Sequence, residues 1–140
     1  WTNRPFACMG KSTGRANASG TSTGNVFICN VTGVNSGIAN TSNGRFTAPT
    51  GFSGYYLVTY SGLGGANETA PNTRWLINGV VQNFGAAHVN NSPNSSRWGL
   101  SAQAIFYLNA GDYLTHNVIG GSLYGSDSVH STHIVMFLHA

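Results

Sequence analysis

The sequence closes with STHIVMFLHA, residues 131–140, and this stretch decides the fold. Its five residues from Ile134 to Leu138 are all apolar. A strand with one face in water alternates apolar and polar residues, because successive side chains point to opposite faces. The uninterrupted run therefore predicts a C-terminal strand that is covered on both faces.

Short runs of apolar, β-branched and aromatic residues recur along the rest of the chain, and nowhere do they keep helical spacing over three turns. Asn78-Gly79 supplies the two positive φ angles of a type I′ turn, so residues 74–81 are predicted to form a hairpin. Every second residue from Leu100 to Leu108 is apolar, which predicts a strand with one fully apolar face. We predict strands at Phe6–Met9, Val26–Val31, Gly44–Ala48, Tyr55–Tyr60, Thr73–Ile77, Val80–Phe84, Leu100–Leu108, Tyr113–Ile119 and Thr132–Leu138.

The composition fits one all-β domain. The 140 residues (14.7 kDa) are 41% hydrophobic and only 6% charged, a profile typical of a turn-rich β protein rather than a disordered chain. The segment Lys11–Asn25 is almost wholly Gly, Ser, Thr, Asn and Ala, and we predict that it is a surface loop. Many short antiparallel strands must close into a barrel or pack as two sheets, because exposed edges invite aggregation. A jelly roll meets this requirement.

The charge and hydropathy patterns exclude two classes of partner. The six Lys and Arg residues are scattered singly, whereas a nucleic-acid footprint requires them to cluster. No apolar window reaches the roughly 18 residues of a membrane helix, so no membrane insertion is expected. The sequence begins at Trp1 and carries no signal peptide pattern. We therefore expect a mature product or the C-terminal head of a longer chain, with residues 1–140 forming a single domain.

Several motifs follow one another along the chain in a recognisable order. GRFTAP at residues 44–49 precedes GYYLVTY at residues 54–60, and LNAGD follows at residues 108–112, after the Asn78-Gly79 hairpin. Together with Leu123-Tyr124 and the closing strand, these motifs resemble the globular head of complement component C1q, within the tumour-necrosis-factor-like superfamily. The resemblance covers nearly the whole chain. It implies a ten-stranded jelly roll that assembles as a homotrimer, with the last strand central in the inner sheet and covered by neighbouring subunits.

We expect the trimer interface to be built from the C-terminal strand and its neighbours in the inner sheet. The residues assigned to it are His133, Val135, Phe137, Tyr56 and Tyr60. His133 and Val135 stand where the family usually carries an aromatic residue and a glycine. The family's axial calcium sites use acidic side chains, of which this chain has only three. Calcium binding is therefore not carried over, and no cofactor or metal is expected.

No catalytic site is expected, because a triad needs a buried carboxylate to orient its histidine and Asp112 lies in a predicted structural turn. His130 and His133 are three residues apart in an extended segment, so they point to opposite faces and cannot chelate one ion together. Three copies of His133 around a three-fold axis are an alternative metal site. The favoured interpretation is a packed histidine with hydrogen-bonded nitrogens. For Cys8 and Cys29, two buried thiols are favoured over a disulfide, which stays open.

A polar loop ends at Trp98, and the large Trp98 ring would be exposed to water there unless it contacts a ligand or anchors the loop. Asn94, Arg97 and Trp98 are therefore the candidate ligand contacts, with a loop anchor as the alternative role of Trp98. We expect a non-enzymatic binding module for a cell-surface glycan or protein receptor, located on a virion or outside the cell. The very low charge favours a virion appendage, such as a phage tail-fibre or head-fibre knob or a capsid decoration protein that contacts other virion proteins. The alternatives are a secreted C1q-like recognition or signalling head and a purely structural trimeric cap.

Overall fold

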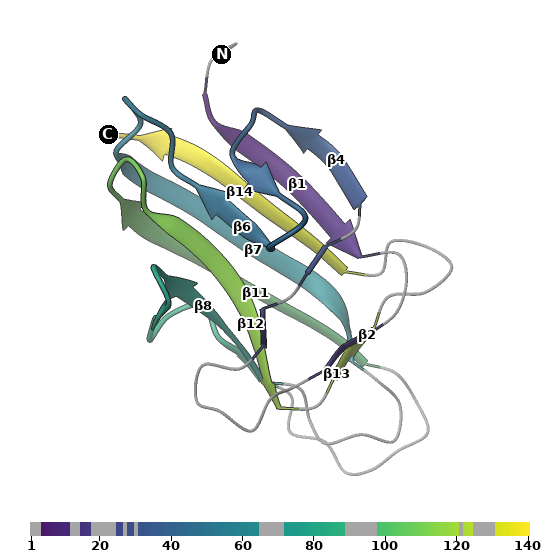
Figure 1. Ribbon diagram of the computed structural model, residues 1–140. Coiled ribbons are helices and arrows are strands. Elements are labelled where there is room, and N and C mark those ends of the chain that lie inside the picture. Colours follow the sequence, from purple (N-terminus) through teal and green to yellow (C-terminus); the bar gives the residue numbers. More distant parts are fainter. Residues whose placement is uncertain are drawn as a thin grey trace.

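Two antiparallel β-sheets form the protein, shown as a computed structural model in Figure 1. The structure describes residues 4–11, 15–17, 25–26, 28–29, 31–64, 72–88, 98–120, 122–124 and 131–140. Each sheet has seven strands in this part of the chain, which contains no helix. No helix long and apolar enough to cross a membrane is therefore found among these residues.

Sheet A is built around its longest strands, and its main order is β11-β7-β14-β1-β4. The C-terminal strand β14 lies between β7 and β1 and is hydrogen-bonded on both sides. Two short strands extend the sheet, because β13 pairs with the end of β7 and β2 pairs with β13. The strands of sheet A are β1 (Phe6–Lys11), β2 (Arg15–Asn17), β4 (Val31–Asn35), β7 (Gly54–Gly64), β11 (Trp98–Leu108), β13 (Ser122–Tyr124) and β14 (Ser131–His139).

Sheet B has β12 at its centre, between β8 and β6. Its main order is β10-β8-β12-β6-β5, with β9 paired to β8 and β3 paired to β12. In Figure 1, β12, β8 and β6 lie in front of the long strands of sheet A. The strands of sheet B are β3 (Asn25–Val26), β5 (Ala39–Asn40), β6 (Arg45–Thr47), β8 (Asn72–Ile77), β9 (Val80–Val81), β10 (Ala87–His88) and β12 (Tyr113–Gly120).

The hydrophobic core lies between the sheets and follows the alternation of side chains along each strand. Every second residue of β11 is buried or partly buried, from Leu100 through Ala104 to Leu108, while Ser101 and Tyr107 point outward. Full burial of a large apolar side chain contributes about 1.5–3 kcal/mol. The largest fully buried side chains are Trp75, Tyr56, Tyr60, Phe46, Met9, Leu108, Leu114, His116, His133 and Val58.

The main predictions from the sequence are confirmed. The chain is an all-β jelly roll, and ten of its described strand segments are three residues or longer. Asn78 and Gly79 adopt φ angles of 51° and 80°, and the hairpin that they close pairs Ile77 with Val80. The closing strand is central in its sheet, as the resemblance implies. Both cysteines are free thiols, and Cys29 is buried while Cys8 is partly buried.

Several predicted boundaries are wrong. The expected strand Val26–Val31 is divided, because β3 ends at Val26 and Ile28 and Cys29 lie outside any strand. The hairpin strand that begins at Val80 ends at Val81 rather than at Phe84. The expected loop Lys11–Asn25 contains β2, which is held by pairing with β13 rather than by apolar residues of its own. Short strands β5, β10 and β13 were not predicted, because each has three residues or fewer.

Candidate functional site

The face of sheet A that points away from sheet B is rich in exposed apolar side chains. We call it the outer face and define it by six residues of β1, β7, β11 and β14. Each is a large apolar residue with between 39% and 58% of its surface exposed. The six residues are Phe6, Tyr55, Ile105, Tyr107, Ile134 and Met136.

Strand register brings these side chains into continuous rows across the sheet. Phe6 lies opposite Met136, which lies opposite Leu57, which in turn lies opposite Ile105. Directly opposed residues of antiparallel strands share a face, so this row is an apolar stripe across four strands. The other described residues of these strands that point the same way, such as Cys8, Thr59 and Gln103, carry no charge. The outer face thus carries an apolar stripe and no formal charge across its centre.

The side chains expected at the trimer interface lie elsewhere. Each is at most 9% exposed, and all five belong to the core between the sheets. The Tyr56 hydroxyl donates a hydrogen bond to the Phe52 carbonyl at 2.7 Å, and the Tyr56 ring packs against Phe137. A side chain enclosed in its own subunit leaves little surface for another subunit. The alternate residues of β7 and β14 point away from the core and carry the outer face. The five residues are His133, Val135, Phe137, Tyr56 and Tyr60.

A mostly apolar hollow of about 380 Å³ opens beside the outer face, near the chain ends. It is lined by Arg4, Phe6, Met136, Phe137 and Leu138. The Arg4 guanidinium donates a hydrogen bond to the Leu138 carbonyl, which ties the first described residues to the last strand. Because Phe6 and Met136 also belong to the outer face, the hollow and the apolar stripe are one continuous surface.

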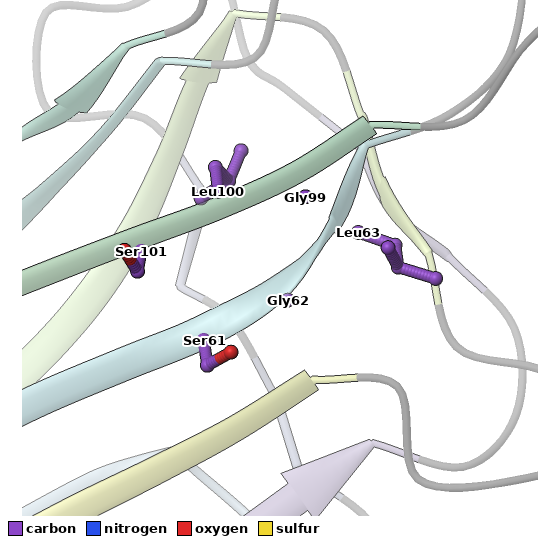
Figure 2. A pocket seen from close by; sticks show the side chains of 6 residues that line it. All are labelled: Ser61, Gly62, Leu63, Gly99, Leu100 and Ser101. Atoms are coloured by element: carbon purple, nitrogen blue, oxygen red, sulfur yellow. The ribbon is translucent and has the colours of Figure 1, made fainter.

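The opposite end of β7 and β11 is polar. A shallow depression of about 330 Å³ lies there, and Figure 2 shows its six lining residues on these two neighbouring strands. Ser61 lies opposite Ser101, and Leu63 lies opposite Gly99. The next pair in register is Gly64 with Trp98, so the backbone of Trp98 adjoins the depression. Asn94 and Arg97 lie outside the described residues, as does the side chain of Trp98.

A buried polar chain links the two sheets through the core. His133 of β14 and His116 of β12 are each 1% exposed, and His133 Nε2 lies 2.8 Å from His116 Nδ1. The other ring nitrogen of His133 lies 3.5 Å from Cys29 Sγ. The interpretation of His133 as a packed, hydrogen-bonded histidine is confirmed, and its burial in one subunit excludes it from a metal site on a three-fold axis. His130 lies outside the described residues.

The Cys29–His133–His116 chain has the residue types of a nucleophilic site but the wrong electrostatics. Burial raises the pKa of the Cys29 thiol to about 12, so the thiol is protonated at neutral pH. A reactive cysteine needs a lowered pKa and access to substrate, and Cys29 is only 2% exposed. Among the described residues, no three His, Cys, Asp or Glu side chains are placed to hold a metal ion.

His116 is the functional-site candidate that sequence reasoning missed. Its position carries one signal, because it shares strand parity with Leu114 and Val118, both of which are fully buried. A histidine in that register is expected to point into the core. Its partner His133 comes from the other sheet, and that pairing depends on how the two sheets pack.

Asp112 has the structural role that the sequence predicted. Its Oδ1 accepts a hydrogen bond from Asn78 Nδ2 at 2.7 Å, and its Oδ2 accepts one from the Asn109 backbone N–H at 2.8 Å. These hydrogen bonds, that from Asn78 first, hold the pKa of the Asp112 carboxyl below its usual value. The carboxylate thereby joins the tip of the β8–β9 hairpin to the turn before β12.

Comparisons with known proteins place the fold. No family model and no curated protein matches the sequence. Among solved structures, the globular domain of zebrafish complement 1qA protein is similar, with a TM-score of 0.65 and 14% identity over 96% of this chain and 95% of that one. Eiger TNF from S. frugiperda is similar with a TM-score of 0.70 and 13% identity over 98% of this chain and 94% of that one. At these identities the comparison establishes the fold.

Proposed function

We propose that this chain, which has the C1q/TNF-like jelly-roll fold that its motifs predicted, is a non-enzymatic, homotrimeric binding module. Its subunits would cover one another's outer faces. The observation that carries this proposal is the outer face itself, where six large apolar side chains are about half exposed and no charged residue intervenes. Large contiguous apolar patches are uncommon on soluble single subunits, and exposed apolar patches mark interaction sites.

A second copy of the same chain is the partner that fits this surface best. The stripe offers no charge to complement, so its partner must also be apolar and poor in charge. A closed ring of three subunits, as the C1q/TNF-like resemblance implies, would cover every outer face without leaving an open end. The apolar hollow beside Phe6 and Met136 gives a neighbouring side chain a place to insert.

Light scattering at micromolar concentration tests the assembly. We expect a mass three times that of the 14.7 kDa subunit. Ile134→Glu places a charge at the centre of the outer face and should release folded single subunits. Val80→Glu is the matched control, because Val80 is 65% exposed on the β8–β9 hairpin, and this variant should remain trimeric. A wild-type protein that is well folded and monomeric would contradict the proposal.

Ligand recognition is proposed for the loop end of the subunit. Asn94, Arg97 and Trp98 are the proposed contacts, and the Ser- and Gly-lined depression beside the Trp98 backbone supports this assignment. Serine hydroxyls and exposed backbone bind polar ligands such as glycans or a protein receptor. Three copies of a weak site would gain avidity. Glycan-array binding that is lost in Trp98→Ala while the trimer persists would support recognition, and a trimer that binds nothing would favour a structural cap.

The proposed setting is a virion appendage, such as a fibre knob or a capsid decoration protein that also contacts other virion proteins. The support is compositional, because only 6% of residues are charged and Gly, Asn, Ser and Thr dominate the rest. A secreted recognition or signalling head is the alternative, and the domain is proposed to end a longer chain in either case. Neighbouring capsid or tail genes would favour the virion, whereas a collagen-like Gly-X-Y stretch upstream would favour secretion.

A further inference from the structure

The hydrogen bond between His116 and His133 spans the core from one sheet to the other. His116 belongs to β12 of sheet B, and His133 belongs to β14 of sheet A. The bonded nitrogens are 2.8 Å apart, and the ring planes are inclined at 65°. Each residue is 1% exposed, so water does not reach either ring in the packed sandwich.

The surroundings of the pair are aromatic. Tyr60 of β7 packs against both histidine rings, with centroids 4.4 Å from His116 and 4.9 Å from His133. Trp75 of β8 packs against both as well, at 4.7 Å and 5.8 Å, and Phe46 of β6 lies 6.4 Å from the His133 ring. These three rings close the site from β7, β8 and β6.

The titratable and charged groups near the pair offer no negative charge among the described residues. Tyr60 of β7 and Cys29 of the segment before β4 both face the histidine pair. A protonated phenol or thiol carries no charge, so neither residue supplies an anion in that form. Lys11 of β1 interacts with the Cys29 thiol and is itself cationic. The one side-chain carboxylate in the described part of the chain, Asp112, is occupied by Asn78 and Asn109 in the turn before β12.

One additional proton on the neutral pair would therefore create a buried cation without an adjacent anion. In the neutral state one N–H lies between the two bonded nitrogens, and one ring donates while the other accepts. Desolvation of an ionised group in such an environment is costly. Burial accordingly lowers the pKa of His133 to about 3, and burial together with the neighbouring His133 lowers the pKa of His116 well below 6.5.

We propose that the His116–His133 pair is an acid-sensitive lock on the sandwich: the sheets stay packed while both rings are neutral and separate in mild acid. The lock acts within one subunit and does not rest on the proposed trimer. Separation of the sheets would also disrupt the outer face. Ile134 adjoins His133 on β14, so Ile134 is displaced from the outer face when that strand leaves the core.

The sign of the pH dependence follows from linkage. Both histidines have lower pKa values in the folded state than in the unfolded chain, where the ordinary value is 6.5. Below pH 6.5 the unfolded chain binds more protons, so stability falls as the pH falls. For each unit by which the pH falls below 6.5, one histidine raises the unfolding constant about tenfold and the pair raises it about a hundredfold. This dependence ends where the folded-state pKa values are approached.

Denaturant unfolding of the whole chain between pH 7.5 and pH 4.5 tests the lock. We expect the wild-type unfolding constant to rise below pH 6 with the slope of two extra protons. The double variant His116→Gln/His133→Gln should lose that slope, while His139→Gln should keep it, because His139 is exposed at the end of β14. Equal slopes in the wild type and the double variant would overturn the proposal.

Ring nitrogen NMR of the wild type provides a test that does not depend on variants that fold. His116 and His133 should keep neutral-imidazole shifts for as long as folded signals persist. Folded signals should then disappear together in mild acid. If either buried ring titrates near pH 6.5 while the sandwich stays folded, the lock does not exist.

Discussion

Tyr55 and Tyr107 lie directly opposite each other on β7 and β11 and pack edge to face, with ring centroids 5.3 Å apart and planes inclined at 81°. Edge-to-face pairs contribute about 0.5–1.5 kcal/mol beyond the area they bury. We expect a double-mutant cycle of Tyr55→Ala and Tyr107→Ala to give a favourable coupling near the lower end of that range, because both rings are about half exposed. The cycle is measured by denaturant unfolding at one fixed protein concentration. A coupling of zero would show that the two rings do not depend on each other.

Gly54 begins β7 in a position that admits no side chain. Its φ angle is 153°, and a Cβ atom there would lie 2.4 Å from the His139 carbonyl oxygen and 2.9 Å from the Phe137 ring. We expect Gly54→Ala to lower the free energy of unfolding by about 2 kcal/mol or more, because backbone must move to make room. Gly99→Ala is the matched control, since nothing lies within 4 Å of a Cβ there, and it should cost about 0.5 kcal/mol or less. Similar losses in the two variants would contradict this account.

The Asp112 carboxylate should stabilise the chain independently of pH over the range in which the histidine pair acts. Asp112→Ala removes its hydrogen bonds to Asn78 and Asn109 and should cost about 1 kcal/mol at pH 7. The pKa of Asp112 lies below its ordinary value of 3.8, so this contribution is present above pH 3.8 and is lost only as the pH falls through the folded-state pKa. Chemical unfolding at pH 7 and pH 5 should give the same difference from the wild type. A difference that already shrinks by pH 5 would argue against the assigned role.

The buried side of a strand could be predicted where polar residues alternate with apolar ones, because the polar residues mark the side that faces outward. In β11, Ser101 and Gln103 mark the outward side, so the buried side from Leu100 to Leu108 was assigned correctly. In β14 the residues of both parities are apolar, and alternation alone does not tell whether Val135 or Ile134 faces the core. For that reason the β14 residues expected at the interface, His133, Val135 and Phe137, are on the parity that the structure buries in the core.

The candidate site was less accessible to sequence reasoning than the fold. The type I′ turn at Asn78-Gly79 is a local property of two residues, and the chain adopts it as predicted. The His116–His133 contact instead joins strands of different sheets and depends on how those sheets pack. Side-chain pattern within one strand carries no information about a partner across the core, which is why the pair emerges only from the structure.

The Cys29 thiol should be unreactive in the folded protein. It is 2% exposed, and burial raises its pKa from 9.0 to about 12. Because the thiolate is the nucleophile, its population at pH 8 should be about a thousandfold smaller than in the unfolded chain. We therefore expect alkylation by iodoacetamide to spare Cys29 in native protein and to modify it rapidly in denaturant. Peptide mapping by mass spectrometry distinguishes Cys29 from the partly buried Cys8.

The denatured sample is the control for intrinsic reactivity, since Cys8 and Cys29 should label there at comparable rates. Native labelling of Cys29 as fast as in the unfolded chain would mean that the core around His133 opens readily at pH 8. Hydrogen exchange at the amides of β14 is the complementary measurement, because it reports opening of the core without requiring a thiolate. Slow exchange together with protected Cys29 is the result expected of a sandwich that the histidine pair keeps closed at neutral pH.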